Sequence, residues 1–348
     1  MPEEKRRQQR WKLILTIVTL VALAAVVYFA REQILETISN LSRVNRYALL
    51  LMIPAQMLNY HAYARMYQAL FAVLAHKIRY GYLVRVVLEL NFVNNVFPSG
   101  GVSGFSYFGL RMKAEGVSYG KATLVQMMRF ILLFVSFQVL LFIGLILLVI
   151  GGQASQFVIL IASSLATLLL VGTIAAAFII GSKRRINGFF TYLTRLVNKL
   201  IHVLRPKHPE TINVDRVERV FTDLHENYMV LKKNPGFLKK PLFYGLLANL
   251  AEVLTIYVVY IAFGEWVNPG AVIIAYAVAN FAGLVSVLPG GVGIYEALMT
   301  AIMASAGVPA GVSLPVTIMY RVLNMGMQLP PGYYYYHRAL HSNEVPKP

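Results

Sequence analysis

The chain of 348 residues has no cysteine and little negative charge. Without cysteine it can form no disulfide, no thiolate zinc site and no cysteine nucleophile, and the redox state of its compartment cannot be read. Its two aspartates, Asp215 and Asp223, fall in one polar segment, so no Asp-x-Asp motif for a metal-bound nucleotide sugar exists. The histidines show no metal-ligand spacing, and there is no phosphate-binding P-loop. We therefore expect no metal, no cofactor and no use of ATP by this chain.

Charged residues of either sign are scarce. Of all residues, 57% are hydrophobic and 14% are charged, and the mean hydropathy is +0.60. Soluble domains are roughly 45–50% apolar. Residues 130–182 and 266–295 contain no charged side chain, and a membrane-spanning helix needs only ~20 apolar residues. The composition predicts an all-α polytopic membrane protein.

The charge that is present is mostly positive, with a formal net value of +17. Lys and Arg collect in cytoplasmic loops of membrane proteins and attract anionic lipid. We therefore expect membrane lipids with anionic headgroups as partners, and no nucleic acid. The basic stretch KRRQQRWK precedes the uncharged segment 13–30. That segment is long for a signal peptide, which predicts a retained first helix.

Apolar segments predict about six full spans. They are 13–30, 47–75, 121–150, 155–181, 241–263 and 312–336. Basic residues in the tail 1–12, at 76–79 and in 182–240 place these parts inside. Both termini, including the tail 337–348, are then cytoplasmic. Segment 182–240 is too short for an enzyme domain and is predicted to form a basic amphipathic segment on the membrane surface.

Two further apolar segments, 80–117 and 270–307, are interrupted at Pro98 and Pro289, each followed by a Gly-Gly pair. With the orientation above, the first must enter and leave on the cytoplasmic face and the second on the outer face. A re-entrant helical hairpin satisfies this requirement. Two full crossings in each segment would give the same parity, so both arrangements stay open.

The spans that flank the hairpins run in opposite senses. Segments 47–150 and 241–336 are therefore predicted to be two inverted-topology repeats, each with one Pro-Gly-Gly re-entrant hairpin. Corresponding residues recur at a nearly constant offset: Gly101 and Gly291, Gly116 and Gly307, Arg129 and Arg321. Membrane transporters use such repeats, with the substrate site near the midplane at the repeat interface.

Charged side chains inside spans are costly, which makes each one a candidate functional residue. The guanidinium groups of Arg129 and Arg321 could hold a phosphate through paired hydrogen bonds, although Arg129 could instead extend to the membrane interface. Glu296 could pair with a cationic headgroup or carry a proton; the alternative is a structural ion pair with Arg321. Glu252 lies deep in its span without a partner nearby in the sequence.

Other polar residues have simpler interpretations. Glu89 follows Arg85 by four residues, which predicts an ion pair along one helix. Intramembrane asparagines usually hydrogen-bond between helices, but those before the breaks could cap opened backbone. The glycines of each break allow backbone N–H groups to approach an anion at a helix N-terminus. The predicted substrate-binding set is Arg129, Arg321, Glu296, Gly100, Gly101, Gly290, Gly291, Asn95 and Glu252.

Two blocks of sequence carry a family resemblance. They are NFVNNVFPSGGVSGFSYFGLRMKAEGVSYGKATLVQMMR and SVLPGGVGIYEALMTAIMASAGVPAGVSLPVTIMYR. They resemble the signature blocks of the lysylphosphatidylglycerol synthase transmembrane region, a flippase-like integral membrane family, and the resemblance extends over about 12–338. Relatives often have an acidic residue after the first Gly-Gly and a Glu-Arg pair, whereas here Val102 and Ser103 follow Gly101 and Met128 precedes Arg129.

The resemblance implies a multi-pass protein of a prokaryotic plasma membrane. In bifunctional relatives a soluble synthase domain aminoacylates phosphatidylglycerol and the membrane region moves the product outward. We expect this chain to be a stand-alone member without the synthase domain. It would flip a phospholipid, an aminoacylated phospholipid or a polyprenyl-phosphate lipid, alone or as a homo-oligomer. The alternatives are a membrane-embedded lipid glycosyl- or aminoacyl-transferase and a non-catalytic subunit that recruits a separate lipid-modifying enzyme.

Overall fold

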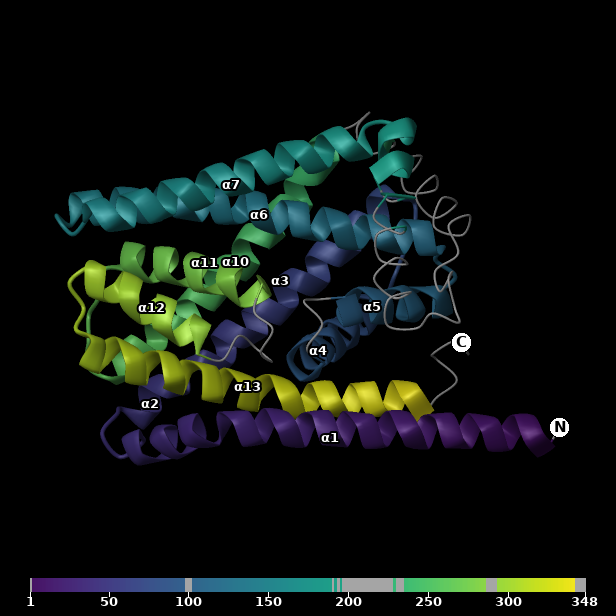
Figure 1. Ribbon diagram of the computed structural model, residues 1–348, viewed down its shortest axis with the longest axis horizontal. Coiled ribbons are helices and arrows are strands. Elements are labelled where there is room, and N and C mark those ends of the chain that lie inside the picture. The colour runs from purple at the N-terminus through teal and green to yellow at the C-terminus, as the bar shows by residue number, and fades with distance from the viewer. Residues whose placement is uncertain are drawn as a thin grey trace.

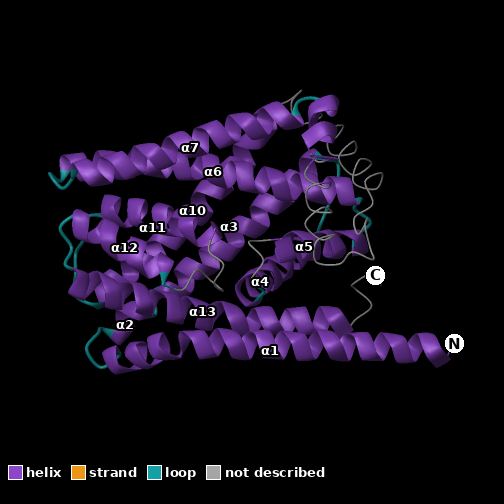
Figure 2. Cartoon of the chain, viewed as in Figure 1, coloured by secondary structure: helices purple, strands orange, loops and turns teal. Residues whose placement is uncertain are grey.

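The computed structural model describes residues 2–97, 102–189, 191, 192, 195, 228, 229, 235–285 and 293–341. Within these ranges all regular structure is helical (Figures 1 and 2). A short 3-10 helix, Pro235–Leu238, precedes α10. The α-helices are α1 (Pro2–Asn40), α2 (Arg46–Leu49), α3 (Met52–Val73), α4 (Tyr80–Val96), α5 (Val102–Ala114), α6 (Tyr119–Ile150), α7 (Gln156–Ile180), α10 (Lys239–Ala262), α11 (Pro269–Val285), α12 (Ile294–Ser305) and α13 (Ala310–His341).

Four of the described helical stretches are long and apolar enough to cross a membrane: Thr16–Asn40, Tyr119–Ile150, Gln156–Ile180 and Gly236–Ala262. Of the six predicted spans, these correspond to the first, third, fourth and fifth. Helices α3 and α13 cover the other two predicted spans with 22 and 32 residues, but they are more polar. The prediction of an all-helical membrane protein is confirmed.

Helices α3 and α10 pack against each other in the centre of the molecule (Figure 1). Helices α6 and α7 form one layer, and α13 lies beside α1 in another. Helices α4 and α5 lie toward the end of the molecule where α1 begins, and α11 and α12 lie toward the opposite end. Since α13 ends near the start of α1, these two helices run antiparallel.

Helix lengths recur in order in the two halves of the chain. Helices α3, α4, α5 and α6 have 22, 17, 13 and 32 residues. Helices α10, α11, α12 and α13 have 24, 17, 12 and 32 residues. In each half the central helix, α3 or α10, is therefore followed by two shorter helices and one long helix.

The ends of the short helices also match. Gly116 follows α5 with φ +74°, and Gly307 follows α12 with φ +89°. The next residue then donates backward, from Val117 N–H to the Met112 carbonyl at 3.0 Å and from Val308 N–H to the Met303 carbonyl at 2.9 Å. Both turns are Schellman motifs, in which glycine tolerates the left-handed conformation.

Glycines allow close contact between the long helices α6 and α13 and the shorter helices α11 and α4. Gly144 of α6 faces Gly270 of α11 so closely that a Cβ on Gly270 would lie 2.3 Å from the Gly144 carbonyl oxygen. Gly332 of α13 faces α4 in the same way, where a Cβ would lie 2.7 Å from the Leu88 carbonyl oxygen. Small residues at helix contacts allow such backbone approach in membrane proteins.

The structure departs from the predicted boundaries at the first helix. α1 continues past the predicted end of its span at residue 30 and reaches Asn40. Arg31 and Glu32 are exposed and are good helix formers, so the helix can continue where the apolar segment stops. Both Pro-Gly-Gly breaks and most of segment 182–240 lie outside the described residues.

Candidate functional site

The first polar cluster surrounds Glu252, near the middle of α10 and 8% exposed. Four side-chain donors reach its carboxylate. From α3, the amides of Gln56 and Asn59 donate to Oε2 at 3.2 and 3.1 Å. From α13, the amide of Asn324 donates to Oε1 at 2.9 Å and the hydroxyl of Tyr320 donates to the same oxygen. Three helices therefore converge on one carboxylate, and within the described chain no cation pairs with it.

A row of amides extends from this cluster to α4. Gln328 donates to the Asn324 side-chain oxygen at 2.9 Å and accepts a hydrogen bond from the Asn95 amide at 3.2 Å. Asn95 also donates to the Asn91 carbonyl one turn earlier in α4, at 2.8 Å. Side chains of α4 and α10 are thereby joined through α13.

The second polar cluster is an ion pair between Glu296 of α12 and Arg321 of α13, which are 4% and 7% exposed. Glu296 lies in the first turn of α12, and its Oε2 accepts the Gly293 N–H at 2.7 Å. Its Oε1 accepts both the Arg321 guanidinium and the Gln33 amide of α1. The guanidinium carbon lies 5.0 Å from the ring centre of Tyr295. The carboxylate thus caps α12 and connects three helices.

A groove opens beside this ion pair between α1, α12 and α13, with a volume of about 620 Å³. Gln33, Glu296 and Thr300 contribute its polar side chains. The rest of its lining is mainly small or apolar: Ala297, Ala301, Ala304, Ala310, Leu314 and Ile318. Several of these alanines are exposed, so the groove faces the surroundings of the protein. Glu296, which is paired with Arg321, forms part of its wall.

Arg129 of α6 lies among aromatic rings instead of beside a carboxylate. Its guanidinium carbon is 4.9 Å from the ring centre of Tyr63, 5.7 Å from that of Tyr67 and 5.3 Å from that of Phe130. Its Nε atom is buried without a hydrogen-bond partner. Aromatic faces attract a guanidinium but leave its full charge in place. Arg129 therefore differs from Arg321, whose charge Glu296 balances.

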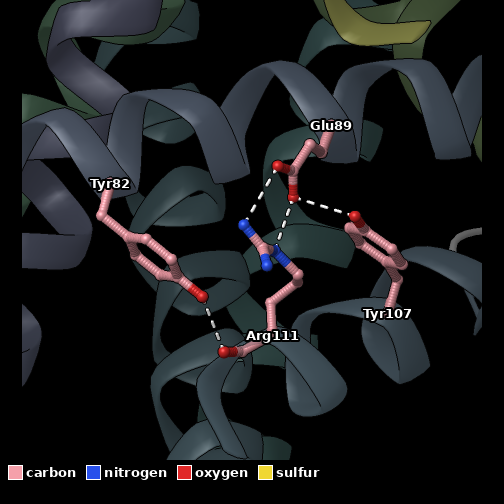
Figure 3. A network of polar contacts seen from close by, with 4 residues as sticks. All are labelled: Tyr82, Glu89, Tyr107 and Arg111. Carbon is pink, nitrogen blue, oxygen red and sulfur yellow. Dashed lines mark hydrogen bonds and ion pairs between the residues drawn. The ribbon is translucent and has the colours of Figure 1, made fainter. Parts of the chain in front are cut away.

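A further ion pair, which the sequence did not predict, joins α4 and α5 (Figure 3). Arg111 of α5 donates to Glu89 of α4 through Nε at 2.8 Å and Nη2 at 3.2 Å, and both side chains are 1% exposed. The Tyr107 hydroxyl donates to the same carboxylate at 2.9 Å, and Tyr82 donates to the Arg111 carbonyl at 2.8 Å. The predicted pairing of Glu89 with Arg85 is wrong, because the partner comes from the facing helix.

The structure brings together part of the predicted substrate-binding set. Glu252 and Asn95 belong to the first cluster and its amide row, while Glu296 and Arg321 form the second. Arg129 approaches the first cluster through Tyr63, whose ring lies in electrostatic reach of both Arg129 and Glu252. The four glycines of the breaks lie outside the described residues.

Several residues of these clusters were not in the predicted set. The signal that could have found them is helical spacing of polar residues within apolar segments. On one face of α3 these are Gln56, Asn59, Tyr60 and Tyr63; on α13 they are Tyr320, Asn324 and Gln328. Gln33 lies close to charged Arg31 and Glu32 at the end of the first apolar segment, so its sequence neighbours gave no such signal.

The fold and the polar clusters together define an all-helical integral membrane protein. Its packed helices bury charged and amide side chains between them. The chain belongs to the family described as the lysylphosphatidylglycerol synthase TM region, whose model matches residues 13–332. The resemblance carried by the two Pro-Gly-Gly blocks is thereby confirmed.

Relatives in the same class come from archaea. A UPF0104 membrane protein of Methanothermobacter thermautotrophicus is 36% identical over 83 residues, or 24% of this chain and 25% of the relative. A second match in that organism, also to a UPF0104 membrane protein, is 30% identical over 124 residues, 33% and 35% of the two chains. A UPF0104 membrane protein of Pyrococcus horikoshii is 21% identical over 172 residues, 49% and 51%. The chain thus spans about a quarter to a half of the length of the curated relatives it matches.

Proposed function

We propose that this protein moves a lipid with a phosphate-containing headgroup across a prokaryotic plasma membrane without ATP. The lipid would be a phospholipid, an aminoacylated phospholipid or a polyprenyl-phosphate lipid. Two inverted repeats, α3–α6 and α10–α13, would enclose its headgroup, and α4–α5 and α11–α12 would be the re-entrant hairpins. A separate lipid-modifying enzyme is a proposed partner that would supply the substrate.

The recurring helix lengths and matched Schellman turns support the repeat proposal. At 1.5 Å per residue, the described helices of the two proposed hairpins are shorter than the ~30 Å hydrocarbon layer of a bilayer. They have 17 and 13 residues in the first, and 17 and 12 residues in the second. A hairpin that enters and leaves on the same side of the membrane can be built from such short helices. The start of α1 and the end of α13 lie toward the same end of the molecule (Figure 1), which favours both termini on one face of the membrane.

The observation that carries the lipid proposal is the charge of Arg129. A guanidinium inside a membrane protein is costly unless an anion or polar groups compensate it. Here the side chains of Tyr63 and Tyr67 hydrogen-bond to the guanidinium, and the Phe130 ring lies beside it. These neighbours are neutral, and the buried Nε has no hydrogen-bond partner. A phosphate would provide the missing acceptor and the missing negative charge.

The groove at Glu296 and Arg321 supports a lateral route for the lipid. Its alanine-rich lining suits hydrocarbon, and its wall includes the carboxylate of the Glu296–Arg321 ion pair. A lipid could leave its acyl chains in the groove while the headgroup approached Arg321. Exchange of the Arg321–Glu296 contact for an Arg321–phosphate contact would leave the carboxylate with its Gln33 and Gly293 donors and free it to pair with a cationic headgroup.

Lipid movement in proteoliposomes tests this proposal. Headgroup-labelled anionic, aminoacylated or polyprenyl-phosphate lipids would be followed as they become accessible to a membrane-impermeant quencher. Arg129→Gln should slow the movement roughly tenfold or more, because a hydrogen bond to a charged group contributes about 1.5–3 kcal/mol. Arg31→Gln is the control, since its side chain is 57% exposed.

If the wild-type protein moves none of these lipids, the proposal is overturned, and the transferase or recruiting alternatives are favoured. Movement that Arg129→Gln leaves unchanged would contradict the assigned role of Arg129. Loss of movement in Arg31→Gln as well would indicate a general requirement for positive charge instead of a site at Arg129.

A further inference from the structure

Glu252 differs from the other buried carboxylates of the described chain in what surrounds it. Glu89 and Glu296 each pair with an arginine, whose positive charge balances that of the carboxylate. All four groups that donate to Glu252 are neutral. Neutral donors stabilise the ionised form without cancelling its charge, so the net charge of this cluster depends on whether Glu252 binds a proton.

The side chains that face Glu252 are mostly tyrosines, so Glu252 is the group of the cluster that would gain or lose a proton. Tyrosines from several packed helices lie within electrostatic reach of the carboxylate: Tyr60 and Tyr63 of α3, Tyr276 of α11, Tyr295 of α12 and Tyr320 of α13. Tyrosines are normally neutral throughout the physiological pH range. The cation of α6 on this side is Arg129, whose guanidinium carbon lies 4.9 Å from the ring centre of Tyr63.

The structure also contains an acceptor for the proton. Gln56 is 1% exposed, and its Oε1 atom is buried without a hydrogen-bond partner while its Nε2 donates to Glu252. Rotation of this amide by half a turn would exchange the two atoms. A protonated Glu252 could then donate its O–H to Gln56 Oε1, where the ionised form accepts from Nε2.

We infer that Glu252 and Gln56 form a proton-binding site that couples lipid movement to the proton gradient. In the ionised state Glu252 accepts from its four neighbours and fastens α10 to α3 and α13. When it takes up a proton, one acceptor position becomes a donor, Gln56 turns, and the contacts to Tyr320 and Asn324 on α13 weaken. Because α13 also carries Arg321, the change reaches the charged end of the groove.

This inference rests on the proposed function for the coupling step but not for proton binding. Proton binding can be measured by itself, by infrared difference spectroscopy of the reconstituted protein between two pH values. The wild type should show the carbonyl stretch of a buried protonated carboxyl at the lower pH. Glu252→Gln should remove that band, and Glu32→Gln, which removes an 87% exposed carboxylate, should keep it.

A second variant protects the measurement against a simple folding defect. Asn59→Leu removes one donor to Glu252 and retains the carboxyl group. Since that donor favours the ionised form, its loss should displace the midpoint of the infrared band to higher pH by about one unit. A band that is insensitive to Glu252→Gln, or a midpoint that Asn59→Leu leaves unchanged, would overturn the proton site.

Coupling is tested by lipid movement in proteoliposomes with and without an imposed pH gradient. The gradient should change the rate several-fold in the wild type and in Glu32→Gln, and have no effect in Glu252→Gln. Lipid movement that ignores the pH gradient, or follows a sodium gradient instead, overturns coupling and leaves the proposed function intact. Absence of lipid movement in every condition overturns both coupling and the proposed function, while the infrared band still decides whether Glu252 binds a proton.

Discussion

Arg321 of α13 and Gln33 of α1 donate to the same carboxylate oxygen of Glu296, so one atom on α12 joins three helices. The other oxygen caps the start of α12 through the Gly293 N–H. Removing one partner of a buried ion pair leaves an uncompensated charge, which costs more than the pair itself contributes. This arrangement makes the pair a structural element as well as a candidate site.

Arg321→Ala is therefore expected to destabilise the protein by about 3–5 kcal/mol. The double variant Arg321→Gln, Glu296→Gln should lose less than the sum of its two single variants, because no charge is left unpaired. Unfolding midpoints in detergent measure both effects, with Arg31→Ala as the exposed control. A loss within about 0.5 kcal/mol for Arg321→Ala, the range of ordinary surface substitutions, would contradict a stabilising ion pair.

Substitutions of Glu89 and of Arg85 distinguish the observed ion pair, Glu89–Arg111, from the predicted pair, Glu89–Arg85. Glu89→Ala removes the carboxylate from buried Arg111 and Tyr107, and should destabilise the protein by about 3–5 kcal/mol. Arg85→Ala should change stability by no more than about 0.5 kcal/mol, because its side chain is exposed. Thermal unfolding in the same detergent distinguishes the two. Equal losses would restore the pairing along one helix.

Two glycines of α13 should respond in opposite ways to alanine. A Cβ on Gly332 would lie 2.6 Å from the Cβ of Phe92, whereas nothing lies within 4 Å of a Cβ on Gly326. Gly332→Ala should destabilise the protein by about 1–3 kcal/mol through overpacking. Gly326→Ala should be neutral or stabilise by up to about 1 kcal/mol through helix propensity. Unfolding midpoints that move in the same direction would argue against the α4–α13 contact.

Much of the fold follows from local sequence signals. Long uncharged runs mark α6 and α7, and Gly116 and Gly307 mark the ends of α5 and α12. The partners of buried charges could not be predicted in the same way, since they lie on other helices. Arg85 lies one helical turn from Glu89 in the sequence. Glu89 nevertheless pairs with Arg111, because α5 packs against α4. Gln33 illustrates the same limit, because tertiary packing alone brings it to Glu296.

The contact between Gly144 and Gly270 has a mechanical consequence for the two halves of the molecule. Helix α6 comes from one half and α11 from the other, and at this point their backbones meet without a side chain between them. Side chains pack around this point, because Ile273 and Ile274 of α11 lie close to Gly144. The Asn268 amide, just before α11, also donates to the Leu147 carbonyl of α6 at 3.1 Å. The contact therefore fastens the two halves to each other, so a rotation of one half has to carry the other helix along or break this hydrogen bond.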